Sequence, residues 1–121
     1  MAKSDGGDFD LEERTAVFGE RIVGFAKKVV VTAVNKNMIT QLVDAGTSIG
    51  ANYGEANEAE SKKDFRHKIA ICKKESKESM YWLRMFGKGE PNLRDEAAEL
   101  WREAKEFTLI FAKIMRSCDG K

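Results

Sequence analysis

Side chains suited to acid–base or nucleophilic chemistry are few in this chain of 121 residues. The single histidine, His67, lies in the run Arg66-His67-Lys68 without a nucleophile beside it, so it cannot form a catalytic triad. Asp64 precedes it by three residues, but one acid and one histidine do not make the paired Glu-x-x-His set of a di-metal bundle. We expect a solvated histidine, no catalytic site, no metal site and no cofactor.

The two cysteines, Cys72 and Cys118, lie too far apart for a metal-ligand motif or a disulfide framework. We interpret both as reduced thiols that behave as small hydrophobic residues. No apolar run approaches the roughly 20 residues of a membrane span. Met1-Ala2-Lys3-Ser4 leads into acidic and glycine residues instead of a signal-peptide core. We therefore expect a cytoplasmic protein with no membrane partner.

Positive charge is concentrated between residues 62 and 84. At about 100° per residue along a helix, the basic side chains there fall within an arc of roughly 140°, beside an apolar stripe. We call this set the basic ridge: Lys62, Lys63, Arg66, His67, Lys73, Lys74, Lys77 and Arg84. Such a ridge predicts salt-dependent binding of nucleic acid. The alternative is a solvated face partly paired with Glu75, Glu78 and acids of neighbouring helices, and the net charge of +1 gives no global argument for nucleic acid.

Large apolar side chains outside the expected core predict self-association. Ile71 and Trp82 project almost opposite the apolar stripe of their helix, and Trp101 lies beside the stripe of its own helix. Aromatic residues at such positions are typical anchors of protein interfaces. We therefore predict a homo-oligomer with these three residues near the subunit contacts.

Glycines recur at every fourth position in Gly46, Gly50 and Gly54, which places them along one side of a helix. Each costs roughly 1 kcal/mol relative to alanine in a helix interior. The pattern predicts a close approach of a neighbouring helix. A phosphate-binding loop is the competing interpretation, but the Gly-Lys-Ser/Thr ending and a preceding strand are both missing.

The elements that position these residues are helices. Hydrophobic residues make up 42% and charged residues 34%, with a single proline, which favours long amphipathic helices in one domain. We expect a disordered lead at residues 1–9, a four-helix bundle at 10–118 and a tail at 119–121. Short connectors between the helices predict an all-α, antiparallel up-down-up-down bundle.

Helix boundaries follow from capping residues. Asp10 and Glu13 form a capping-box pattern before a helix over about 11–33. Asn37 is placed to cap the second helix, Ser61 to cap a third that reaches about residue 86, and Pro91 to open the fourth. The expected core is Phe18, Ile22, Phe25, Leu42, Ile49, Phe65, Ile69, Leu83, Leu100, Phe107 and Phe111.

The segment over 41–55, Gln-Leu-Val-Asp-Ala-Gly-Thr-Ser-Ile-Gly-Ala-Asn-Tyr-Gly-Glu, is followed by Ser-Lys-Lys-Asp-Phe at 61–65. Together with Glu-Ser-Lys-Glu at 75–78, Tyr-Trp-Leu at 81–83, and the stretches 11–15 and 100–106, it resembles a bacterial four-helix bundle family. That S23-like family includes proteins encoded in intervening sequences of large-subunit ribosomal RNA genes. The resemblance implies a ring-like homopentamer and a link to RNA.

The resemblance also marks Ser48, Asn52 and Glu55 as signature polar positions, for which we expect buried hydrogen bonds. Asp44 stands where the family usually has a basic residue, which argues against a nucleic-acid surface on the second helix. The variant form Gly54-Glu55-Ala56 is a second departure.

The architecture is also similar to the accessory variability protein of diversity-generating retroelements, although that protein is strongly basic and this chain is not. Three hypotheses follow: an RNA-associated oligomer, an accessory subunit that binds a reverse transcriptase and its template RNA, and a scaffold that binds only proteins.

Overall fold

The computed structural model describes residues 7–120, with side chains from residue 10 to 120. Four long helices make up most of it: α1 (Gly7–Lys28), α2 (Lys36–Asn57), α3 (Lys62–Gly89) and α4 (Arg94–Cys118). A 3-10 turn, Pro91–Leu93, precedes α4, and residues 7–120 contain no strand. The prediction of an all-α chain with four helices is confirmed. No helix among these residues is long and apolar enough to cross a membrane.

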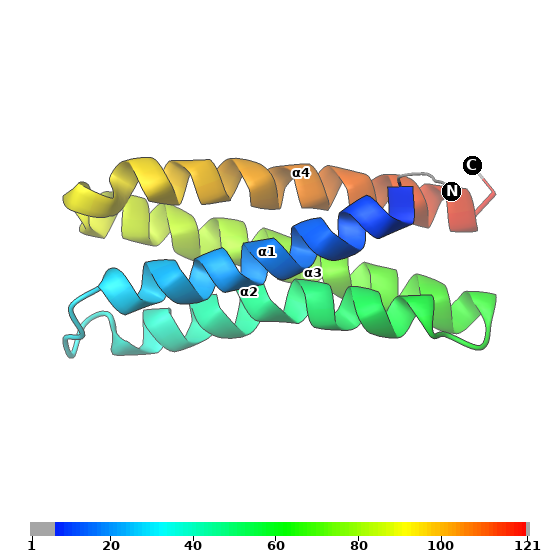
Figure 1. Ribbon diagram of the computed structural model, residues 1–121, viewed down its shortest axis with the longest axis horizontal. Helices are drawn as coiled ribbons and strands as arrows, with labels where there is room; N and C mark the ends of the chain where they lie inside the picture. Colours follow the sequence, from blue (N-terminus) through cyan, green and yellow to red (C-terminus); the bar gives the residue numbers. More distant parts are fainter. Residues whose placement is uncertain (1–6, 121) are drawn as a thin grey trace.

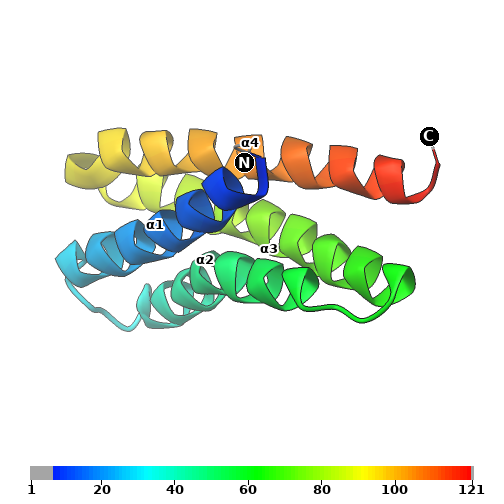
Figure 2. The same cartoon turned by 45° about the vertical axis from the view of Figure 1, so that its right-hand side comes forward.

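Successive helices run in opposite directions along the long axis of the molecule (Figure 1). α3 packs closely against both α2 and α4, whereas the backbone of α1 lies close to α2 and farther from α4. Figure 2 shows α1 crossing the other helices obliquely. The outer surface of α3 is therefore flanked by α2 and α4 and is not covered by a fourth helix.

Ion pairs join α1 to α4 along their length. They are Arg14 with Glu103 and Glu106 (2.8 Å each), Arg21 with Glu99, and Lys28 with Glu96 (2.8 Å). The basic partners recur every seven residues, about two helical turns. Because the partner numbers fall along α4 as they rise along α1, the two helices run in opposite directions.

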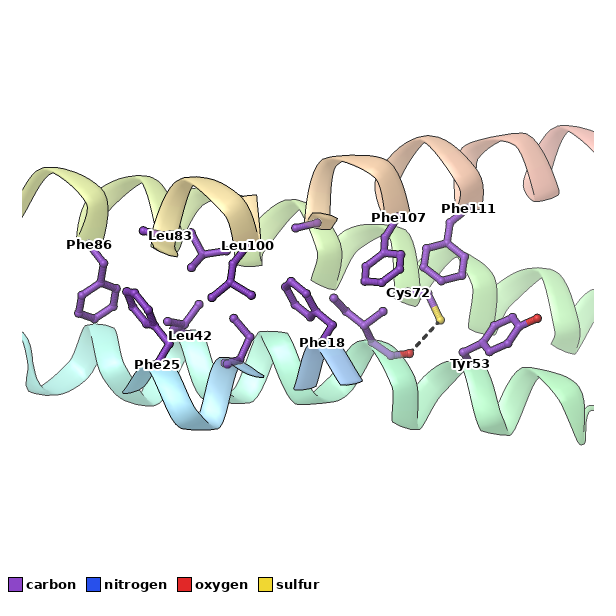
Figure 3. Close-up of a cluster of buried hydrophobic side chains, with 14 of the residues drawn as sticks. Phe18, Phe25, Leu42, Tyr53, Cys72, Leu83, Phe86, Leu100, Phe107 and Phe111 are labelled. Carbon is purple, nitrogen blue, oxygen red and sulfur yellow. Dashed lines mark hydrogen bonds between the residues drawn. The ribbon is translucent and has the colours of Figure 1, made fainter. Parts of the chain in front are cut away.

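Aromatic rings fill the centre of the bundle (Figure 3). Phe18 packs edge-on against Phe107 with ring centroids 5.4 Å apart, and Phe25 packs edge-on against Phe86 at 5.8 Å. Every residue of the predicted core is buried except Phe65, which is only partly buried against it. Phe65 lies in the first turn of α3, where the bundle ends and fewer neighbours remain to cover it.

Two of the three regularly spaced glycines lie where α1 approaches α2. A Cβ atom added to Gly46 would lie 2.7 Å from Cγ1 of Ile22, and one added to Gly50 would lie 3.3 Å from the backbone of Thr15. A Cβ atom at Gly54 would meet nothing within 4 Å. The predicted close approach is thus confirmed for Gly46 and Gly50 and is wrong for Gly54.

α1 is displaced toward the N-terminus relative to its predicted range. It begins at Gly7, so Asp10 lies inside the helix instead of capping it, and residues 1–6 of the expected lead lie outside the described residues. It ends at Lys28, so Val30 and Val31 lie in an exposed connection and not in the helix.

Asn35, and not Asn37, occupies the cap position of α2 and organises this connection. Its Oδ1 accepts from the amide of Thr32 at 2.8 Å, and its Nδ2 donates to the carbonyl of Val30 at 2.9 Å. The side chain is buried, and these local hydrogen bonds satisfy its amide. The cap at Ser61 is confirmed, since its Oγ accepts from the amide of Asp64 at 3.0 Å.

The contrast between two of the glycines predicts opposite effects on stability. Gly46→Ala should lower the free energy of unfolding by about 1 to 3 kcal/mol, because the new methyl group overlaps Ile22. Gly54→Ala should raise it by up to about 1 kcal/mol, because the methyl group enters open space and stiffens the helix. Urea unfolding measures both, and equal destabilisation by the two substitutions would contradict the α1–α2 geometry.

Candidate nucleic-acid interface

α3 separates an apolar face from a charged one. Ile69, Cys72, Ser76 and Leu83 are buried, while most of the basic ridge projects to solvent. The N-terminus of α3 is stabilised because Ser61 caps it and Asp64 complements the positive end of the helix dipole. α3 therefore presents the ridge on a single well-capped helix.

Neutralisation of the ridge within the chain is limited. Arg66 is the exception, since its Nε and one terminal nitrogen donate to the two carboxylate oxygens of Asp119 at 2.5 and 2.8 Å. This bidentate bond raises the pKa of Arg66. Lys74 approaches Glu78 only to 4.0 Å, and no other ridge residue forms an ion pair within residues 10–120.

The acids expected to neutralise the ridge do so weakly. The pKa of Glu75 is raised, first by burial and then by the neighbouring charge of Glu78. Its carboxylate forms no ion pair with a lysine in the described chain. The described chain therefore gives little support to the alternative that acidic residues pair with most of the basic ridge.

Three lysines of the ridge meet in a shallow groove on the outer side of α3. We call it the lysine groove, lined by Ala70, Lys73, Lys74, Lys77, Glu78, Tyr81 and Met115. Met115 comes from α4, so the groove lies toward the α3–α4 side. Lys62, Lys63 and His67 are exposed nearer the start of α3 and do not line it.

A second groove lies between α3 and α4, toward the far end of α3. We call it the arginine groove, lined by Leu83, Arg84, Gly87, Arg94, Ala97, Ala98, Trp101 and Arg102. Of this set, only Arg84 and Trp101 are among the candidate site residues predicted from the sequence. Arg94 and Arg102 were missed because they lie on α4, and only the packing of α4 on α3 brings them beside Arg84.

Nucleophilic and metal-binding groups do not gather at either groove. The Cys72 thiol is buried and donates to the carbonyl of Ile49 at 3.5 Å (Figure 3). Burial raises its pKa to about 12, so it is not a reactive thiolate. Cys118 is partly buried, and no cluster of three His, Cys, Asp or Glu side chains in the described part of the chain could hold a metal ion.

The three residues expected at subunit contacts are all partly buried in the single chain. Trp82 packs against the core, so the expectation that it points away from the core is wrong. Ile71 is also only partly exposed. Trp101 packs against the core and carries the ammonium group of Lys105 5.4 Å from its ring centroid. The exposed aromatic of this region is Tyr81.

The signature polar residues of α2 bond locally. Ser48 donates to the carbonyl of Asp44 at 2.5 Å, and Asn52 donates to the carbonyl of Ser48 at 2.9 Å. Glu55 accepts from Lys68 of α3 at 2.7 Å while 60% exposed. The expectation of a buried hydrogen bond is therefore wrong for Glu55. Ser48 and Asn52 are only partly buried. Asp44 is exposed.

A family model described as 23S rRNA-intervening sequence protein matches residues 8–112. The chain belongs to this family. The match covers most of each of the four helices, and it includes every residue of the arginine groove and every residue of the lysine groove except Met115.

A solved structure agrees with this assignment to the intervening-sequence family. It is the crystal structure of a protein with unknown function from the S23 ribosomal protein family of Bacteroides thetaiotaomicron. That protein is 31% identical, the alignment covers 90% of this chain and 97% of the other, and the TM-score is 0.81. A search of curated proteins gives no match.

The neighbouring aromatics Tyr81 and Trp82 should differ sharply in their structural roles. Trp82→Ala should cost about 2 to 4 kcal/mol of unfolding free energy, because it leaves a cavity beside the core. Tyr81→Ala should cost less than about 1.5 kcal/mol, since it loses mainly the edge-on contact with Trp82. Urea unfolding at a fixed protein concentration compares them, and a larger loss for Tyr81→Ala would contradict the assignment.

Proposed function

We propose that this member of the intervening-sequence family is a non-catalytic, oligomeric, RNA-associated module of the cytoplasm. Its RNA contact is the basic ridge of α3, and the contact is made mainly with phosphates. Binding of this kind has little sequence preference and weakens steeply with salt. Structured RNA is then held by its shape and backbone.

The lysine groove is the observation that carries this proposal. Lys73, Lys74 and Lys77 converge on one shallow surface that also includes Glu78, and only Lys74 has a carboxylate within 4.0 Å. Three lysines and a single glutamate leave this surface with an excess of positive charge, and a polyanion relieves the repulsion among the lysines. Arg66 contributes less, because Asp119 already occupies its guanidinium.

Assembly strengthens such a site. A near-neutral chain has no large field of its own, but a closed ring of subunits repeats the same lysine groove around one axis. Several weak contacts to one RNA then act together through a high effective concentration. We propose a ring-like homopentamer of antiparallel bundles, with Ile71 and Trp82 near the subunit contacts and Trp101 as a further candidate.

The arginine groove supports a second candidate function. Arg84, Arg94 and Arg102 surround an apolar floor that includes Trp101, and arginine and tryptophan are the residues most enriched at energetic centres of protein interfaces. A groove of this chemistry suits an acidic segment of another protein. In this hypothesis the chain is an accessory subunit that binds a reverse transcriptase and its template RNA, or a scaffold that binds only proteins.

Light scattering tests the assembly. We expect a mass about five times the 13.6 kDa of one chain at micromolar concentration. Trp82→Ala should lower the fraction of oligomer, and Val34→Ala, which removes an exposed side chain at the α1–α2 connection, is the matched control. A wild-type protein that remains a monomer refutes the ring, whereas an unchanged oligomer in Trp82→Ala removes only that residue from the contact.

Salt titration tests the RNA contact. A variant with Lys73→Glu, Lys74→Glu and Lys77→Glu should lose affinity for structured RNA and show a shallower dependence on salt, because three phosphate contacts are gone. The matched control carries Lys27→Glu, Lys36→Glu and Lys113→Glu. These lysines are exposed, lie outside both grooves and form no ion pair in the described chain.

Both variants change the net charge by the same amount, so a general charge effect would weaken both equally. Equal loss in the two variants, or no binding by the wild type at low salt, would refute the α3 surface as an RNA site. The arginine-groove hypothesis would then be tested by pull-down with a reverse transcriptase, comparing wild type with Arg94→Glu and Arg102→Glu.

A further inference from the structure

We infer that the lysine groove takes an unpaired stretch of RNA and stacks one of its bases on Tyr81. This inference rests on the proposed RNA contact and adds to it the form of the RNA that is preferred. A set of lysines alone accepts any polyanion. The aromatic ring beside them offers a contact that only an exposed base can make.

Tyr81 is 55% exposed although aromatic side chains usually bury most of their surface. It lines the lysine groove together with Lys77, four residues earlier, on the same side of α3. Its ring therefore lies within the positively charged surface and not apart from it.

The ring of Tyr81 contacts a neighbouring aromatic side chain. Trp82 packs edge-on against it, with ring centroids 4.9 Å apart and planes at 84°. Trp82 itself is fixed against the core. A ring supported in this way loses little freedom when a base stacks on it, which favours binding.

The chemistry around the ring matches a nucleotide part by part. Lys73, Lys74 and Lys77 carry the charge that neutralises phosphates, and Ala70 and Met115 supply apolar surface for the sugar and the base edge. Arg84 follows Tyr81 by three residues and opens the arginine groove, so cationic groups continue along α3 beyond the ring. A strand can therefore pass over Tyr81 with phosphate contacts on both sides.

A duplex cannot use this arrangement. Its bases are stacked within the helix, so it can offer the groove only phosphates and sugars. An unpaired strand presents base faces as well, and each base stacked on an aromatic ring strengthens binding independently of its identity. In a folded RNA, the segments that satisfy the groove are loops, bulges and single-stranded ends.

The experiment compares two labelled RNAs by fluorescence anisotropy at low salt. One is an unpaired oligouridylate of about 12 nucleotides, a length within the usual range for such sites, and the other is a blunt duplex of similar length. The wild type should bind the unpaired strand more tightly. Tyr81→Ala should weaken binding of the unpaired strand about fivefold to a hundredfold and leave duplex binding unchanged.

Two further variants distinguish base stacking on the ring from the effect of side-chain size. Tyr81→Phe keeps the ring and should bind like the wild type, whereas Tyr81→Leu keeps an apolar side chain without a π face and should resemble Tyr81→Ala. Circular dichroism and light scattering check that each variant keeps its fold and assembly, and Tyr81→Leu provides the measurement if Tyr81→Ala does not fold.

The outcomes distinguish this inference from the proposed function. If the triple glutamate variant weakens both RNAs but Tyr81→Ala and Tyr81→Leu bind the unpaired strand like the wild type, the stacking inference is overturned and the phosphate contact stands. Equal loss of strand and duplex binding in the Tyr81 variants also overturns it. If the triple glutamate variant binds both RNAs like the wild type, the proposed function fails.

Discussion

α3 must bury one continuous apolar stripe against two helices at once, and the rest of the bundle depends on that requirement. Its buried side chains pack between α2 and α4, while α1 completes the core from the far side through Phe18 and Phe25. The side of α3 that faces neither neighbour is left to solvent. A ligand that binds along the length of α3 must therefore contact this outer side, where most of the charged side chains are basic.

The same geometry explains why the positive charge remains available. α1 is joined to α4 by ion pairs that use the acids Glu96, Glu99 and Glu103 of α4. Those carboxylates are paired with basic residues of α1, while Lys73, Lys74 and Lys77 line the lysine groove beside the exposed ring of Tyr81. The net charge of +1 is thus an average over differently charged sides of one small domain.

Much of the fold follows from the sequence, because apolar periodicity and local capping specify helices. Ser61 caps α3 through its own hydroxyl, a local interaction that the sequence contains in full. The end of α1 was misplaced because Val30 and Val31 continue an apolar pattern, whereas hydrogen bonds from Asn35 fix the connection. The sequence predicts the side-chain contacts of the candidate nucleic-acid interface less completely than it predicts the helices. The Arg66–Asp119 bond joins residues far apart in the chain, and helical projection alone placed Trp82 outside when packing makes it part of the core edge.

If RNA lies along the outer side of α3, as we propose, photo-crosslinking with identification of the linked peptides will locate it there. A structured RNA containing photoreactive uridines would be irradiated with the wild-type protein at low salt. We expect crosslinks to residues 73–84 of α3, with Tyr81 foremost, and to the adjoining part of α4 around Met115. Crosslinks confined to α1 and α2, or none under conditions where the RNA is bound, would contradict it.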